Sequence, residues 1–128
     1  MFRTASNFIN KTLGNSVEIE PSDIREQFTG LISDQEEILI SYKLIRDIII
    51  VTDKRFITID KQGLTGKKVE MTSIPLRSIT MITTETKGHL DMESELKLWV
   101  SGRVSPIELT FGSSVDITKI QRLLFNHM

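Results

Sequence analysis

Histidine and acidic residues at alternate positions offer the best case for metal chemistry in this sequence. His89, Asp91 and Glu93 would share one face of a strand that began early, and nitrogen and oxygen donors of this kind bind divalent metal ions. However, Lys87-Gly88 is typical of a turn just before them, and exposed polar residues at a strand start need no ligand to explain them. We therefore predict no metal site and no bound cofactor.

Two other motifs suggest catalysis, and neither has the required context. The segment 63–68 has the composition of a phosphate-binding loop, but it lacks the motif's spacing and joins two predicted strands instead of leading into a helix. Its glycines fit a turn. His127, the other histidine, is better explained by the dipole of a helix end than by a Ser-His-Asp nucleophilic site. The sequence therefore predicts no catalytic residues and a protein that is not an enzyme.

Composition excludes further classes of function. The 128 residues carry 16 Lys+Arg against 17 Asp+Glu, so the chain lacks the broad positive field that nucleic-acid binding normally requires. With no Cys, disulfides and thiolate metal sites are excluded. The longest apolar run, 48–51, is far shorter than the roughly 20 residues of a membrane helix. We expect one compact cytoplasmic domain that does not bind nucleic acid.

Most of the elements that position the polar residues are short strands. In the first strand, Ile38, Ile40, Tyr42 and Leu44 alternate with polar residues and should share one buried face. The continuous apolar run 48–51 indicates instead a strand covered on both faces. Turn residues separate seven predicted strands, at 36–44, 47–52, 55–60, 67–74, 78–86, 91–101 and 104–111.

The N-terminal segment, residues 1–13, has the spacing of a short amphipathic helix and no signal-peptide pattern. Its apolar positions are Phe2, Ala5, Phe8, Ile9 and Leu13. A helix this short, with only Arg3 and Lys11 as basic side chains, would bind a membrane weakly. We expect it to dock onto its own domain, at 14–128, or onto a neighbouring subunit, in preference to a membrane.

Two helices complete the expected architecture. Residues 22–31 should form a short helix capped by Ser22, and residues 117–124 an amphipathic helix after a capping box of Ser113 and Asp116. A bent seven-stranded antiparallel sheet leaves unpaired strand edges and an open end lined with apolar side chains. A terminal amphipathic helix can cover that open end. The fold class is mainly β: a pleckstrin-homology-like (PH-like) seven-stranded antiparallel bent barrel, capped by a C-terminal α-helix, with short N-terminal helices.

Six short blocks of the sequence carry a resemblance to a known family. They are KLIRD at 43–47, TDKRF at 52–56, DKQGLTGKK at 60–68, SIPLRSI at 73–79, ELKLWV at 95–100 and PIEL at 106–109. In order and spacing they resemble the signature blocks of the bacterial PH-domain family, from about residue 14 onward. The resemblance implies a PH-like barrel, no known enzyme activity and cyclic homo-oligomers, with five-membered rings expected for short chains.

Trp99 offers a physical basis for such an assembly. Strand alternation puts Trp99 on one face with Glu93, Glu95 and Lys97 and the neighbouring leucines on the other. An outward tryptophan fits a subunit contact, although cover by the N-terminal helices would explain it equally well. The candidate oligomer or partner interface is therefore Glu93, Glu95, Lys97 and Trp99.

A basic rim gives an alternative function, binding to phospholipid or to a membrane surface. Arg46, Lys61, Lys67 and Lys68 belong to turns at one end of the meander, and the resemblance adds Arg103. The connection that carries Arg46 is too short to wrap a phosphorylated headgroup. We therefore favour a non-catalytic five-membered ring that presents a polar surface to an unidentified protein partner, with the lipid-binding adaptor as the alternative.

Overall fold

A computed structural model describes residues 16–44, 47–62, 68–86 and 93–128 of the chain. The helices and strands are β1 (Val17–Glu18), α2 (Pro21–Gln27), β2 (Ile38–Lys43), β3 (Asp47–Thr52), β4 (Arg55–Gln62), β5 (Lys68–Pro75), the 3-10 helix η1 (Leu76–Ser78), β6 (Ile79–Thr86), β7 (Ser94–Val100), β8 (Ile107–Phe111) and α3 (Ile117–His127). The N-terminal segment, residues 1–13, lies outside the described residues.

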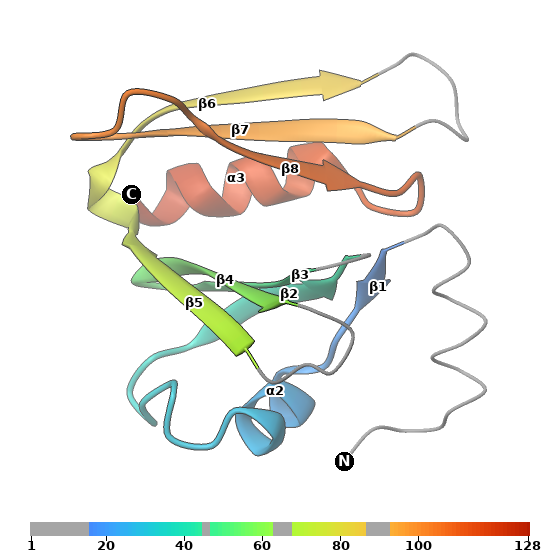
Figure 1. Cartoon of the computed structure of the whole chain (residues 1–128), viewed down its shortest axis with the longest axis vertical. Coiled ribbons are helices and arrows are strands. Elements are labelled where there is room, and N and C mark those ends of the chain that lie inside the picture. The colour runs from blue at the N-terminus through green and yellow to red at the C-terminus, as the bar shows by residue number, and fades with distance from the viewer. Residues whose placement is uncertain (1–15, 45–46, 63–67, 87–92) are drawn as a thin grey trace.

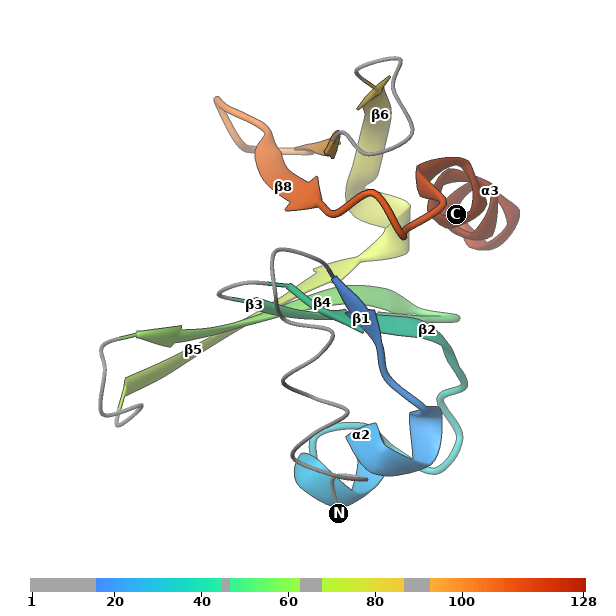
Figure 2. The same cartoon turned by 90° about the vertical axis from the view of Figure 1, so that its right-hand side faces the viewer.

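The strands form two antiparallel sheets. The first sheet has the order β1-β2-β3-β4-β5, and the second sheet has the order β6-β7-β8. Figures 1 and 2 show the second sheet and α3 on one side of the first sheet, and α2 on its other side. This arrangement confirms the predicted mainly β, PH-like architecture with a C-terminal helix. β1 was not expected, because a strand of two residues has no alternation that a sequence pattern can reveal.

The apolar run in β3 is buried on both faces, as predicted. Ile49 and Val51 belong to the main core, which also contains the apolar face of α3. Ile48 and Ile50 belong to a second core beneath α2, with Ile24 at its centre. Because successive strand residues point to opposite faces, one unbroken apolar strand supplies both cores.

The expected single face of β2 is wrong at its first residue. Ile38 pairs with Thr52 and Ile40 with Val51, so β2 has one extra residue between these pairs. This β-bulge turns Ile38 toward the second core, whereas Ile40 faces the main core. Strict alternation could not predict the bulge, because both side chains are apolar.

Both predicted helix caps are also wrong. α2 begins at Pro21 with Glu20 in the N-cap position, so Ser22 lies inside the first turn, where the ring of Pro21 presets the backbone. α3 is capped by Asp116, whose Oδ1 accepts hydrogen bonds from the N–H groups of Thr118 at 3.1 Å and Lys119 at 3.4 Å. Ser113 lies in the turn before that cap.

Candidate functional site

The exposed side of the second sheet carries the predicted Trp99 surface. In β7, Leu96 and Leu98 are fully buried, whereas Lys97 and Trp99, which alternate with them, are only partly buried. Trp99 therefore faces away from the main core. Its cross-strand partner on β6 is Met81, which is 49% exposed. An apolar pair thus stands on a solvent-facing sheet.

We call this side of the second sheet the outer face. Its members are Met81, Thr83 and Glu85 of β6, Glu95, Lys97 and Trp99 of β7, and Glu108 and Thr110 of β8. Sequence alternation alone did not single out Met81, Glu85 or Glu108. The positions of the β6 and β8 residues beside β7 depend on strand register, and the register includes an irregularity between Ile79 and Met81.

Weak polar contacts hold the centre of the outer face. The Nε1–H group of Trp99 donates to Thr83 Oγ1 at 3.4 Å. Lys97 Nζ lies 3.9 Å from Glu108 Oε1, and the Glu108 side chain is 63% exposed, so this ion pair contributes little to stability.

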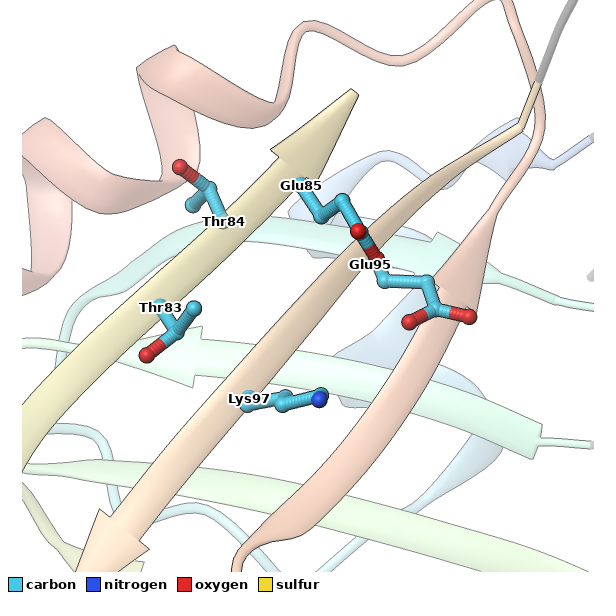
Figure 3. A pocket seen from close by; sticks show the side chains of 5 residues that line it. All are labelled: Thr83, Thr84, Glu85, Glu95 and Lys97. Atoms are coloured by element: carbon cyan, nitrogen blue, oxygen red, sulfur yellow. The ribbon is translucent and has the colours of Figure 1, made fainter. Parts of the chain in front are cut away.

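An acidic row lies along the outer face, away from Trp99. Glu85 and Glu95 are direct cross-strand partners, and like charges in such positions repel each other. Figure 3 shows the two carboxylate side chains on neighbouring strands, with Lys97 farther along β7. With Thr83, Thr84 and Lys97 they line a shallow pocket of about 200 Å³. Two carboxylates and one ammonium group therefore line this pocket.

The described helices pack elsewhere. α2 packs against β2 of the first sheet, and α3 contacts β6 and β7 through residues of the main core. In the part of the chain that the structure describes, neither helix covers Trp99. The predicted helix 22–31 therefore does not provide the intramolecular cover that we considered. Glu93, also predicted for this surface, is exposed just before β7.

The two residues of the predicted basic rim whose side chains the structure describes, Lys68 and Arg103, lie apart. Ser101 at the end of β7 donates its N–H to the carbonyl of Ser78 at 2.9 Å, which places the Arg103 turn beside the end of β5. Lys68 begins β5, about 23 Å away by the rise of an eight-residue strand. Arg46 and Lys67 lie outside the described residues, and of Lys61 only the backbone pairing with Val69 is described.

The metal and phosphate hypotheses fall largely outside the described residues. His89, Asp91 and the loop 63–67 are not among them. Within the described ranges, no group of three His, Cys, Asp or Glu residues could hold a metal ion. His127 Nδ1 lies 2.9 Å from the carbonyl oxygen of Leu123, at the last turn of α3.

A buried ion pair that the sequence analysis missed fixes the loop between α2 and β2. Arg55 Nε lies 2.9 Å from Glu36 Oε2, and Arg55 Nη2 lies 3.0 Å from Glu36 Oε1. Thr52 donates its hydroxyl to Glu36 Oε2 at 2.5 Å, and Arg55 also donates to the carbonyl of Leu31 at 2.7 Å. No local motif reveals the pair, because its members are 19 residues apart.

Opposing effects act on the pKa of Glu36. Burial raises the pKa, but hydrogen bonds from Arg55 and Thr52 and the positive charges of Arg55 and Lys54 lower it, and the net pKa lies below its ordinary value of 4.5. The carboxylate is therefore ionised near neutral pH and binds Arg55 with full charge. This cluster holds the loop in place and belongs to the scaffold, on the first sheet, away from the outer face.

Comparison with known proteins agrees with this arrangement of sheets and helix. The family model described as Bacterial PH domain matches residues 7–128. The chain belongs to the bacterial PH domain family. The uncharacterized protein YjqA of Bacillus subtilis (strain 168) is 41% identical over 118 residues, which cover 91% of this chain and 94% of that protein.

Solved bacterial PH domains share the fold. A Shewanella loihica PV-4 protein, described as a DUF1696 family protein with a pleckstrin-homology domain, is 38% identical with a TM-score of 0.81, covering 89% of this chain and 97% of that chain. A PH domain from Shewanella amazonensis SB2B is also 38% identical, with a TM-score of 0.72 and coverage of 94% and 97%. Neither described helix of the present bacterial PH domain is long and apolar enough to cross a membrane.

Proposed function

We propose that this bacterial PH domain is a non-catalytic assembly module that forms a cyclic homo-oligomer, a five-membered ring, and presents polar surface to a protein partner. The observation that carries this proposal is the cross-strand pair on the outer face of Trp99, which is only partly buried, and Met81, which is 49% exposed. Exposed Trp and Met are enriched at protein interfaces, and a well-packed tryptophan there often dominates the binding energy. The ring order follows the family resemblance.

A ring also requires a second, different surface, because head-to-tail contacts join two unlike patches. β5 supplies a suitable one. It is the last strand of the first sheet, and its Val69 and Met71 are 42% and 49% exposed. Figure 2 shows the β4–β5 hairpin reaching beyond the rest of its sheet. An unpaired strand edge with apolar side chains favours contact with another chain.

Repetition of one polar surface around a ring would give the module its function. A partner with several matching sites binds such a ring through avidity, which raises the apparent affinity by roughly 10²-fold or more over one contact. The acidic row of Glu85 and Glu95 lies away from Trp99 on the outer face and supplies a polar surface of this kind. The lipid-binding alternative has weaker support, because Lys68 and Arg103 are separated by the length of β5.

Solution mass tests the proposal directly. The parent chain should show about fivefold monomer mass by light scattering, and Trp99→Asp should reduce it to monomer mass while the circular-dichroism spectrum stays folded. Phe125→Asp is the matched control, because Phe125 is also apolar and exposed but belongs to α3. A monomeric parent at every concentration, or equal loss of mass in both variants, would contradict the proposal.

A further inference from the structure

The outer face lacks cover in the described part of the chain, and the point where the chain enters that part lies next to it. Ser16 Oγ accepts a hydrogen bond from the N–H group of Gly112 at 3.0 Å, and the Ser114 hydroxyl donates to the Ser16 carbonyl at 3.2 Å. Gly112 directly follows β8, two residues after Thr110. Thr110 is the cross-strand partner of Glu95. The residues before Ser16 therefore start at the end of β8, the edge strand of the second sheet, one strand away from Glu95.

The N-terminal segment is long enough to reach the whole outer face. Glu95 and Trp99 are four residues apart on β7, which corresponds to about 13 Å. Thirteen residues extend about 20 Å as a helix and farther in extended form. The residues between the segment and Ser16 add further reach. Length therefore permits one segment to span the acidic row and the Trp99–Met81 pair together.

The chemistry of the segment complements the chemistry of the face. Residues 1–13 contain Arg3 and Lys11 and no acidic side chain. The face has Glu85 and Glu95 as directly opposed carboxylates, with no ion pair to either of them among the described residues. The apolar positions of the segment recur at helical spacing, which forms one stripe that can cover apolar side chains. The basic side chains of the segment can therefore pair with the carboxylates of the outer face, and its apolar stripe can cover the Trp99–Met81 pair.

We propose that residues 1–13 bind the outer face of their own chain, with the apolar stripe over Trp99 and Met81 and a basic side chain beside Glu85 and Glu95. The segment then acts as a tethered competitor for the neighbouring subunit. The competition rests on the proposed function, whereas the docking itself does not. A tether keeps the local concentration of the segment high, so a weak contact suffices to compete with assembly in dilute solution.

Disulfide trapping in the full-length chain tests the docking, because the natural sequence has no cysteine. Ala5→Cys is combined with Met81→Cys on the outer face or with Met71→Cys on β5. The two methionines form a matched pair, since each is 49% exposed on a strand. After mild oxidation of a dilute sample, the Met81 pair should give at least about tenfold more intrachain disulfide than the Met71 pair.

Two further variants test whether docking depends on the apolar stripe of the segment and on the carboxylates of the outer face. Phe8→Ser with Ile9→Ser should reduce the Met81 cross-link to the control yield and shift assembly to lower protein concentration. Glu85→Gln with Glu95→Gln should also reduce the cross-link, because it removes the carboxylates that attract the basic side chains. A matched Glu108→Gln variant removes a carboxylate that already pairs with Lys97 and should reduce it less.

The possible results separate docking from assembly. Equal yields for the two cysteine pairs, or disulfides formed only between chains, would overturn the docking proposal even if light scattering shows a ring. An intrachain Met81 cross-link in a protein that stays monomeric at every concentration would support docking and reject the ring. An unchanged cross-link in the Phe8→Ser, Ile9→Ser variant would also overturn the proposal, because contact would then not depend on the apolar stripe.

Discussion

The guanidinium of Arg55 binds both carboxylate oxygens of Glu36, at 2.9 and 3.0 Å, across the gap between the α2–β2 loop and β4. The Glu36 side chain is 5% exposed and the Arg55 side chain 26%. Removal of one partner from such a pair leaves the other charge poorly solvated and unpaired. This pair therefore gives a clear prediction for stability, independent of the proposed function.

Glu36→Gln should lower the free energy of unfolding by about 3 kcal/mol, because Arg55 loses its counter-charge in a mostly buried site. Arg55→Lys should have a smaller effect, since it keeps the charge but loses the paired donors. Glu108→Gln breaks an exposed ion pair and serves as the control, with a change below about 1 kcal/mol. Urea denaturation measures all three, and equal losses would show that the Glu36 pair has no special role.

The same carboxylate predicts how stability depends on pH. The folded-state pKa of Glu36 lies below the ordinary 4.5, so the unfolded chain takes up the proton more readily. The stabilisation is complete above pH 4.5 and decreases as the pH falls through the folded-state pKa. The parent should therefore lose stability more steeply than Glu36→Gln below pH 4.5. Parallel curves for parent and variant would contradict this assignment.

The head-to-tail character of the ring can be tested by mixing. Trp99→Asp damages the outer face and leaves Val69 and Met71 intact, whereas Met71→Asp does the reverse. Each variant alone should be monomeric, and an equimolar mixture should give about twofold mass, because one intact contact joins one copy of each. A mixture that stays monomeric would indicate that the two patches do not bind each other.

Lipid binding should be weak, because Lys68 and Arg103 of the predicted basic rim are separated by the length of β5. Vesicles that contain anionic lipid should sediment no more protein than neutral vesicles at physiological salt. The decisive variant is Lys61→Gln combined with Lys67→Gln and Lys68→Gln. If the parent binds anionic vesicles and this variant does not, the rim is functional and the lipid-binding alternative replaces ours.

The two candidate caps of α3 predict different effects of substitution. Asp116→Ala removes the acceptor for two N–H groups of the first turn, so helix content and stability should both fall. Asp116→Asn keeps an acceptor oxygen and should retain most of both. Ser113→Ala should have no measurable effect. Far-ultraviolet circular dichroism and thermal melting distinguish these cases, and a larger effect at Ser113 would reverse the assignment.

Local patterns predicted those parts of the fold that depend on side-chain periodicity. The run in β3 and the alternation around Trp99 are such cases, because burial on one or both faces leaves a direct trace in the sequence. The bulge after Ile38 leaves no trace, since the residues beside it are apolar too. Only part of the outer face could be predicted. The alternation in β7 placed Trp99 there, but the position of Met81 beside it depends on strand register, which the sequence does not reveal.

Local sequence patterns did not predict contacts between residues that are far apart in the sequence. Glu36 and Arg55 have no shared motif, and their contact exists only because the α2–β2 loop returns to the turn between β3 and β4. The cap at Asp116 was missed for a more local reason. Ser113 and Asp116 both fit a capping pattern, and the choice depends on where the first turn packs, with Ile117 and Ile120 in the main core.

The hydrogen bonds between Ser16 and the Gly112–Ser114 turn have a consequence for biosynthesis. They join residues 96 and 98 positions apart, so they can form only after synthesis has passed Ser114. Closure of so long a loop carries an entropic cost that the sheets and α3 offset only after they have packed. Anchoring of Ser16 is therefore a late step of folding, because it follows the formation of β8 and of the turn after it, whereas β1 can pair with β2 earlier.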